Sequence, residues 1–259
     1  MSEANNDEPC EMLPWDTDFF GFPIARVKKP YLITDMAEPI DAWCRANRVR
    51  CLYVNLASFG AFPAANVAEE MGFRLVDVKQ TMLHMPGRVS PPPHASIIRP
   101  ARTEDLPVLE PMAAKNHAGG RFTYDLAFPR GKGEEMFRVW IRKFVTNSVA
   151  NYREPESGTQ YHCLVAETDG RLSGYAALDI QYNGNIGSIS LLGVDEGVRR
   201  KGVGYDLVHA ALAYFASQRT PTISLVTQAF NFPAQRLYQR CGFITSGCVF
   251  VYHKWYSHG

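Results

Sequence analysis

Two glycines one residue apart, Gly202 and Gly204, stand directly before a helix-forming stretch in LLGVDEGVRRKGVGYDLVHAAL (Leu191 to Leu212). The start of a helix exposes backbone N–H groups and carries a partial positive charge, so it attracts an anion such as a phosphate. Because glycine has no Cβ, a ligand can approach the main chain closely. Three cationic side chains stand at the edge of this segment: Arg199, Arg200 and Lys201. The segment therefore predicts a phosphate-binding loop.

The spacing of these glycines excludes two common nucleotide-binding motifs. A P-loop needs GxxxxGK[ST], which the chain lacks. A dinucleotide fingerprint needs GxGxxG, but Gly202-Val203-Gly204 is followed by Tyr205-Asp206-Leu207. Taken alone, the loop is also compatible with a glycine turn before an ordinary surface helix. A second motif is needed to choose between these interpretations.

That second motif is N-F-P-A-Q-R-L-Y-Q-R-C-G-F, Asn231 to Phe243. The first segment resembles the acyl-CoA loop, R/Q-x-x-G-x-G/A, of the general N-acetyltransferase (GNAT) superfamily. The second matches the signature N-x-x-A-x-x-x-Y-x-x-x-G-F of the same superfamily, with five residues in place: Asn231, Ala234, Tyr238, Gly242 and Phe243. Two signatures in the family's order are more specific than either alone. The chain is therefore identified as a member of the GNAT superfamily.

This resemblance implies a fold and a co-substrate. The fold is α/β, with a mixed, splayed central sheet flanked by helices and with acetyl-CoA (or another acyl-CoA) wedged between two strands. The loop would bind the coenzyme A pyrophosphate, and the strand before it would pair with the pantetheine arm. A backbone N–H near Leu192 to Val194 would polarise the thioester carbonyl, and no metal is required. The expected cofactor-binding residues are Leu192, Gly193, Val194, Arg199, Arg200, Lys201, Gly202, Val203, Gly204, Asn231 and Ala234.

In the family, the tyrosine of the second signature usually protonates the leaving thiolate, and here it is Tyr238. A thiolate leaves poorly unless its charge is quenched as it forms. A phenol, with an ordinary pKa of ~10, arrives protonated and is close to a thiol in acidity. Tyr238 is the predicted general acid; the alternative is an aromatic residue that only packs its helix.

The acceptor amine is suggested by a narrower resemblance. The segments Leu13 to Val27, Gly72 to Asp77 and Gly119 to Asp125 resemble the bacterial TDP-fucosamine N-acetyltransferase group, as does the closing T-Q-A-F-N…V-F-V-Y-H-K-W. Members of that group are two-domain proteins that acetylate a nucleotide-linked 4-amino-4,6-dideoxysugar. The resemblance implies a dTDP-linked amino sugar as the substrate, and a homodimer.

Three residues in the Gly119 to Asp125 segment suit such a substrate, because two phosphates and a flat base call for guanidinium and aromatic groups. These predicted substrate-binding residues are Arg121, Phe122 and Tyr124. The alternative is a loop whose aromatic residues only anchor it to the core.

The group that takes the amine proton is harder to identify. Asp77 stands where the TDP-fucosamine group carries an acidic residue near its active site, and it is the predicted second catalytic residue. It is also compatible with a solvated carboxylate at the end of a strand. His117 is another candidate, although a lone histidine is more often structural. Cys241 has no histidine at a spacing that indicates a covalent route.

Two competing functions stay open. A GNAT enzyme could act on a protein or small-molecule amine, although a polyamine enzyme should be acidic and this chain has a net charge of only +1. A degenerate member could bind acyl-CoA without catalysis, against which the intact loop and Tyr238 both speak. A Tyr238→Phe variant separates an enzyme from such a binding module, because an enzyme should lose most of its turnover while it keeps coenzyme A binding.

Charge and composition exclude several classes of protein. The 27 basic and 26 acidic residues nearly cancel, which argues against general nucleic-acid or membrane-surface binding. The acidic, polar start is unlike a signal peptide, and no apolar run approaches a membrane span. The six cysteines show no CxxC pair or metal spacing. These features predict a cytoplasmic protein with reduced thiols.

The chain divides at a proline-rich stretch, PGRVSPPPHAS. We predict a smaller α/β domain at 1–88, a linker at 89–96 and the GNAT domain at 97–259. Before the linker, strands are expected at 22–30 and 51–58, with a helix at 34–49 and a helix–strand pair around Gly72. After it, the pattern predicts a strand and a helix from about Leu106, a helix at 131–149 and a hairpin turning at Asp169-Gly170. An apolar strand, a helix from Val203, a strand at 222–229, a helix at 233–240 and a strand at 249–256 complete it.

Overall fold

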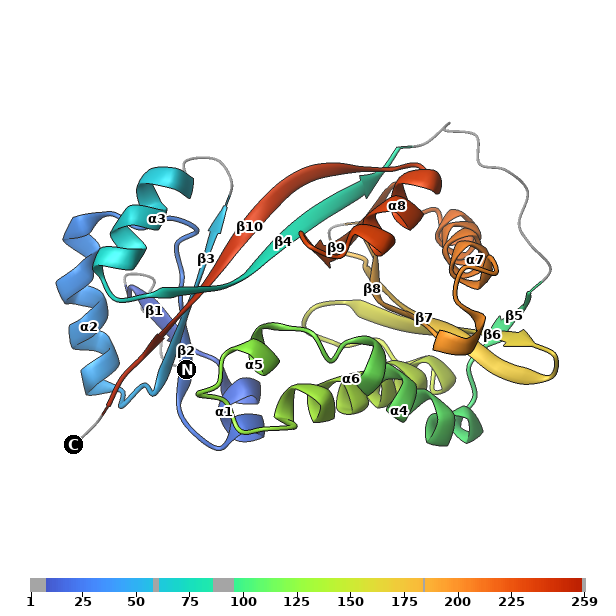
Figure 1. Cartoon of the computed structure of the whole chain (residues 1–259), viewed down its shortest axis with the longest axis horizontal. Coiled ribbons are helices and arrows are strands. Elements are labelled where there is room, and N and C mark those ends of the chain that lie inside the picture. The colour runs from blue at the N-terminus through green and yellow to red at the C-terminus, as the bar shows by residue number, and fades with distance from the viewer. Residues whose placement is uncertain (1–7, 58–60, 86–95, 184, 258–259) are drawn as a thin grey trace. The chain divides into compact units, whose positions relative to one another are not determined.

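The computed structural model describes residues 8–57, 61–85, 96–183 and 185–257 (Figure 1). The chain forms two compact units. The first unit comprises Met1–Gln80, Tyr124–Pro129 and Gly247–Gly259, and the second comprises Thr81–Thr123 and Arg130–Ser246. The predicted linker at 89–96 lies, apart from Ser96, outside the described residues.

The first unit is a small α/β layer. Its elements are β1 (Cys10–Met12), α1 (Pro14–Phe20), β2 (Ile24–Val27), α2 (Ala37–Ala46), β3 (Cys51–Ala57) and α3 (Ala61–Glu70), together with parts of β4 (Arg74–His84) and β10 (Phe243–Trp255). The strand order is β1-β2-β3-β10, with antiparallel pairs at both ends and a parallel β2–β3 pair. The core of this unit gathers side chains from the strands and from α2 and α3, which lie beside them in Figure 1.

Helix α2 shows why the first unit folds as it does. Ile40 and Cys44, one turn apart, are both fully buried, so one face of the helix packs on the core. The helix begins at Ala37, after a 3₁₀ turn at Thr34–Met36. Pro39 therefore falls in the first helical turn, where its missing N–H removes no hydrogen bond. A helix was correctly predicted here, but α2 is shorter at both ends than the predicted range 34–49.

The second unit is a larger α/β layer. Its strands are β5 (Ile97–Pro100), β6 (Thr159–Thr168), β7 (Arg171–Gln181), β8 (Ile186–Val194) and β9 (Thr222–Gln228), and its helices are α4 (Leu106–Asn116), α5 (Arg121–Tyr124), α6 (Lys132–Val149), α7 (Val203–Ser217) and α8 (Phe232–Arg240). Consecutive strands from β5 to β8 pair antiparallel, and β8 pairs with β9 in parallel. The hairpin between β6 and β7 turns at Asp169 and Gly170, both with positive φ, as predicted.

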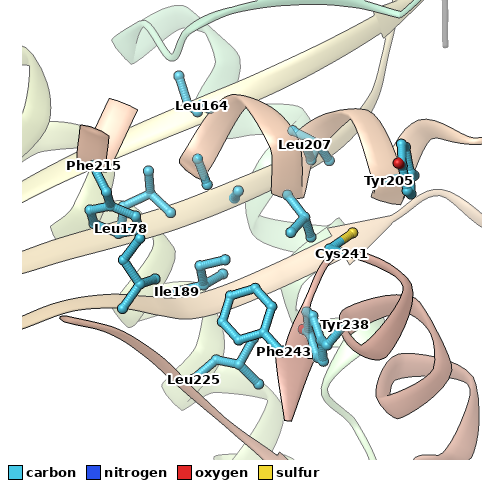
Figure 2. Close-up of a cluster of buried hydrophobic side chains, with 14 of the residues drawn as sticks. Leu164, Leu178, Ile189, Tyr205, Leu207, Phe215, Leu225, Tyr238, Cys241 and Phe243 are labelled. Carbon is cyan, nitrogen blue, oxygen red and sulfur yellow. The ribbon is translucent and has the colours of Figure 1, made fainter. Parts of the chain in front are cut away.

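Helices cover both faces of the strands of the second unit. Along β7, Tyr175 and Ala177 pack with α4 and α6, whereas Ala176 and Leu178 pack with α7. This alternation is the period of two that a strand buried on both faces requires. Figure 2 shows the α7 side of the core, where Leu178 and Ile189 from the strands meet helical side chains.

Several elements differ from the sequence-based expectation. The short elements β1, α1 and α5 were not predicted, because seven residues or fewer give little periodicity. The last strand was predicted from Val249, but β10 begins at Phe243. Its C-terminal half, Val249 to Trp255, pairs antiparallel with Ala57 to Cys51 of β3. No local pattern predicts a pairing across so much of the chain.

Candidate functional site

Strands β8 and β9 separate from one another part of the way along. Their parallel register runs from Ile186↔Thr222 to Ile189↔Leu225 and goes no further, although β8 continues to Val194. The separation begins at a β-bulge, because the pairing of β8 with β7 skips Ser190. A bulge bends a strand and increases its twist.

The bulge is stabilised by a polar contact, and it leaves one edge of β8 open. Ser190 donates a hydrogen bond to the buried carboxylate of Asp179. Beyond it, Leu192, Gly193 and Val194 pair with β7 only, within the part of the chain that the structure describes. Their other edge is available to an extended ligand, as predicted for a splayed sheet.

The glycine loop places backbone N–H groups at the start of α7. Arg200 and Gly202 both adopt left-handed backbone conformations, with φ of 64° and 92°, and the helix begins at Val203. Before the loop, Asp195 accepts a hydrogen bond from the Gly197 N–H over 2.9 Å and so holds the turn. The first N–H groups of any helix have no acceptor within it, so they are available to an anion.

The cationic residues of the loop take different positions. Arg199 donates hydrogen bonds to the Val194 carbonyl (3.3 Å) and to Oδ1 of Asn116 at the end of α4 (2.8 Å). Its side chain therefore braces the loop against the end of β8. Arg200 and Lys201 are exposed, so their charges lie at the surface of the loop.

Three further predicted residues have packing or capping contacts. A Cβ on Gly204 would lie 3.1 Å from Cδ2 of Leu237, so this glycine lets α7 approach α8 closely. The Asn231 side chain accepts a hydrogen bond from the Ala234 N–H over 3.3 Å and caps α8. These contacts hold α8, and with it Tyr238, in place beside the loop helix.

Tyr238 lies on α8 with 7% of its surface exposed. In Figure 2 its ring lies beside Phe243, and the two ring centroids are 6.0 Å apart. Among the described residues its hydroxyl has no hydrogen-bond partner. Burial, with a smaller contribution from the nearby Cys241 thiol, raises the pKa of Tyr238. The phenol is therefore protonated at neutral pH and can act as a proton donor.

A tyrosine and a partly buried histidine form a polar pair against the open strand edge. Tyr175, fully buried, is the cross-strand partner of Gly193 in the β7–β8 register. A Cβ on Gly193 would lie only 2.5 Å from the Tyr175 ring, so only glycine fits there. The Tyr175 hydroxyl lies 3.0 Å from Nε2 of His117, and the imidazole stacks on Phe137.

Burial lowers the pKa of His117 to about 4, so its imidazole is neutral at physiological pH. Sequence reasoning treated His117 as a lone histidine, because nothing in the chain order links it to a tyrosine on β7. The contact depends on the strand register and on where α4 ends.

The predicted substrate residues divide between the two units. The Arg121 guanidinium lies over the Phe122 ring, 4.4 Å from its centroid, in the second unit. Tyr124 is 58% exposed and belongs to the first unit.

Asp77, the predicted second catalytic residue, lies on the part of β4 in the first unit and is 7% exposed. Its Oδ1 has no hydrogen-bond partner among the described residues.

A pocket of about 600 Å³ lies in the first unit. Its walls include Arg74, Leu75, Tyr124, Asp125, His253 and Trp255. The Asp125 carboxylate accepts hydrogen bonds from Nδ1 of His253 (2.7 Å) and from Nε1 of Trp255 (2.9 Å). Burial acts to raise the pKa of Asp125, but these bonds outweigh it and lower that pKa. Sequence analysis gave no role to Arg74, Asp125, His253 or Trp255.

Metal clusters and membrane-spanning helices are both absent from the described ranges. No group of three or more histidine, cysteine, aspartate or glutamate side chains is arranged to hold a metal ion there. None of the helices described is both long and apolar enough to cross a membrane.

Comparison with solved structures shows the fold. A functionally unknown conserved protein from Staphylococcus epidermidis has a TM-score of 0.61 at 14% identity, covering 99% of this chain and 94% of that one. A tandem GNAT protein from the clavulanic acid biosynthesis pathway has a TM-score of 0.59 at 15% identity, covering 91% and 76%. A GCN5-related N-acetyltransferase from Sphaerobacter thermophilus has a TM-score of 0.61 at 17% identity, covering 96% and 77%. The predicted GNAT fold with a preceding α/β part is confirmed.

Comparison with sequences identifies the family. Streptothricin acetyltransferase of Escherichia coli is 31% identical over 151 residues, which are 56% of this chain and 81% of that protein. Mycothiol acetyltransferase of Streptomyces avermitilis is 33% identical over 89 residues, but this chain spans only 29% of its length. The spore coat polysaccharide biosynthesis protein SpsD of Bacillus subtilis is 24% identical over 60% of this chain and 50% of its own. The family model described as "Acetyltransferase (GNAT) family" matches residues 125–243. The chain belongs to this GNAT family, whose members are acyl-CoA-dependent acetyltransferases.

Proposed function

We propose that this acetyltransferase transfers the acetyl group of acetyl-CoA to the amine of a nucleotide (dTDP)-linked amino-dideoxysugar. The observation that carries the transfer chemistry is the open edge of β8 at Leu192 to Val194, next to the glycine loop. A strand edge can pair with an extended ligand that carries amide groups, and a helix start can bind a pyrophosphate. Acetyl-CoA has both parts, so the residues present fit it.

The sugar acceptor is supported by the chain's resemblance to the TDP-fucosamine N-acetyltransferase group and by one named relative. SpsD is named as a spore coat polysaccharide biosynthesis protein. The similarity to SpsD extends over 60% of this chain, whereas the similarity to the mycothiol acetyltransferase of Streptomyces avermitilis extends over 34%. In this proposal, Arg121, Phe122 and Tyr124 contact the nucleotide-sugar.

The chain contributes to each step of the proposed transfer. Backbone N–H groups of Leu192 to Val194 polarise the thioester carbonyl as the neutral amine attacks it. The C–N bond forms, the C–S bond breaks, and the phenol proton of Tyr238 passes to the departing sulfur. The raised pKa of Tyr238 keeps that proton in place until the sulfur becomes basic.

The amine proton needs an acceptor, and the chain offers two. Asp77 is the candidate from the family resemblance, and its buried Oδ1 lacks a described hydrogen-bond partner. His117 is the candidate from the second unit, since its imidazole is neutral and its Nε2 is held by Tyr175. Asp77→Asn and His117→Gln separate the two, because only the residue that takes the proton should lower kcat strongly while leaving acetyl-CoA binding intact.

Thiol release from acetyl-CoA tests the proposed acceptor. The panel would contain dTDP-linked 3- and 4-amino-dideoxysugars, streptothricin, a lysine peptide and spermidine. Turnover with a nucleotide-sugar alone would support the proposal and would identify the position of the amine. Turnover only with the lysine peptide or spermidine would overturn it.

The role of Tyr238 is tested by its phenylalanine variant. Loss of a general acid should lower kcat by about 10²- to 10⁴-fold while the Kd for coenzyme A stays unchanged. Tyr214→Phe is a matched control. Tyr214 lies in the last turns of α7, on the same side of the core as Tyr238, and its ring stacks on His162 of β6. Equal activity of the Tyr238→Phe variant and the wild type would exclude the general-acid role.

A second acceptor class is favoured by one observation. Streptothricin acetyltransferase is more similar in sequence than SpsD is, and this chain covers 81% of it. A free amine on a small molecule is therefore the alternative acceptor. Turnover with streptothricin, without turnover of any nucleotide-sugar, would establish it.

A further inference from the structure

The pocket in the first unit has no part in the transfer chemistry described above. All of its lining residues belong to that unit, although they come from three distant parts of the chain: the start of β4, residues 124–127 and the end of β10. Its volume of about 600 Å³ falls in the range of small-molecule sites. It is large enough for a nucleoside with its phosphates.

The polar floor of the pocket is the Asp125 carboxylate. Its Oδ2 accepts bonds from His253 and Trp255, and its Oδ1 accepts one from the Ala127 N–H over 3.2 Å. A carboxylate offers about four acceptor positions, so Oδ1 retains capacity for a ligand. The lowered pKa keeps Asp125 ionised, and it therefore accepts a hydrogen bond from a ring N–H or a hydroxyl.

An aromatic wall stands next to this carboxylate. The Trp255 indole is held in place by its bond to Asp125 and by Phe22 and Phe128, whose ring centroids lie 5.5 and 4.9 Å away. Tyr124 lines the same pocket and is more than half exposed. Rigid aromatic surfaces bind flat rings by stacking.

One cation completes the lining. Arg74 is exposed, and no ion pair or hydrogen bond engages its guanidinium among the described residues. Guanidinium groups pair with phosphate through two parallel hydrogen bonds. The pocket thus combines an aromatic wall, an acceptor for N–H or O–H groups and a cation.

We propose that this pocket binds the nucleoside diphosphate part of the acceptor substrate. The base stacks against Trp255 and Tyr124, a ring N–H of the base donates to Oδ1 of Asp125, and a phosphate pairs with Arg74. This assignment rests on the proposed function, because it takes the acceptor to be a nucleotide-linked sugar. It adds the residues that recognise the nucleotide, of which only Tyr124 was predicted from the sequence.

Titration of the full-length protein with dTDP, without acetyl-CoA, tests this assignment by calorimetry and by tryptophan fluorescence. The wild type should bind dTDP, and Arg74→Gln should weaken binding by about 10- to 100-fold, the usual effect of losing a charge-assisted hydrogen bond. Arg50→Gln is the matched control, an exposed arginine of the same unit outside the pocket. Trp255→Phe should also weaken binding, because it removes the donor to Asp125.

The outcomes separate this inference from the proposed function. Failure of the wild type to bind dTDP, or equal affinity of Arg74→Gln and Arg50→Gln, would overturn the pocket assignment. Arg74-dependent binding of dTDP without acetyl transfer to any nucleotide-sugar would retain the pocket and reject the proposed acceptor. Transfer to a nucleotide-sugar with an unchanged KM in Arg74→Gln would retain the acceptor and reject the pocket.

Discussion

Replacing Gly193 with alanine tests whether the open edge of β8 positions the reacting thioester. The added Cβ would lie 2.5 Å from Cε1 and 2.7 Å from Cζ of Tyr175. Carbon atoms in contact prefer about 3.5–4.0 Å, so one side must move by roughly 1 Å. Tyr175 is fully buried and its hydroxyl is hydrogen-bonded to His117, so we expect the backbone of β8 at Gly193 to move rather than the tyrosine ring.

Two effects of different size follow from that shift. Overpacking costs about 1–3 kcal/mol, which lowers the melting temperature by about 2–12 °C for a domain of this size. Displacing the backbone that polarises the thioester by about 1 Å should lower kcat/KM by about 10²-fold. Differential scanning fluorimetry measures the first effect, and thiol release at varied acetyl-CoA concentration measures the second.

Gly187→Ala is the matched control. Its Cβ would meet the Phe215 ring at 2.6 Å, on the same strand but within the stretch that is paired with β9. We expect a comparable loss of stability with turnover close to that of the wild type. If Gly193→Ala has normal turnover, or if Gly187→Ala loses as much, the positioning role of the β8 edge is refuted.

Three further predictions concern the loop, a cap and an ion pair. Gly202→Ala places a Cβ at a φ of 92°, so we expect a loss of about 1–2 kcal/mol in denaturant unfolding and weaker coenzyme A binding; unchanged affinity would contradict the loop's role. Asn231→Ala removes the cap of α8 and should cost about 1 kcal/mol, whereas Asn231→Ser should restore most of it. Hydrogen bonds from Lys143 and then Tyr161 lower the pKa of Glu154 from 4.5 to about 2. Ionised Glu154 therefore stabilises the folded state fully above pH 4.5, and this stabilisation is lost as the pH falls toward 2. Glu154→Gln should flatten the dependence of the unfolding free energy on pH in that window. An unchanged pH dependence would contradict the role of Glu154.

Local patterns predicted the regular elements of the second unit well. Alternation, helical periodicity and turn residues located β6, β7 and α6, because each depends on neighbours close in sequence. The glycine spacing likewise located the loop before α7, because Gly202 needs a conformation that few other residues adopt. In each case the structural requirement lies within a few residues of the signal.

The contacts that sequence analysis missed all depend on long-range register. The bond between His117 and Tyr175 requires α4 to end beside β7. The pocket around Asp125 requires residues 124–127 to meet the end of β10, which carries His253 and Trp255. Neither arrangement leaves a local signal, because the chemical character of each residue fits a simple packing role equally well.

The return of the last strand to the first unit has a consequence for biosynthesis. Until Val249 to Trp255 arrive, β3 has no antiparallel partner along its residues Cys51 to Ala57. At about 5–20 residues per second, a ribosome takes about 10 to 40 s to travel from Ala57 to Val249. During that interval an apolar strand exposes its hydrogen-bonding groups, a state that invites aggregation or chaperone capture. A nascent chain that stops before Val249 would therefore leave β3, and with it the first unit, incompletely folded.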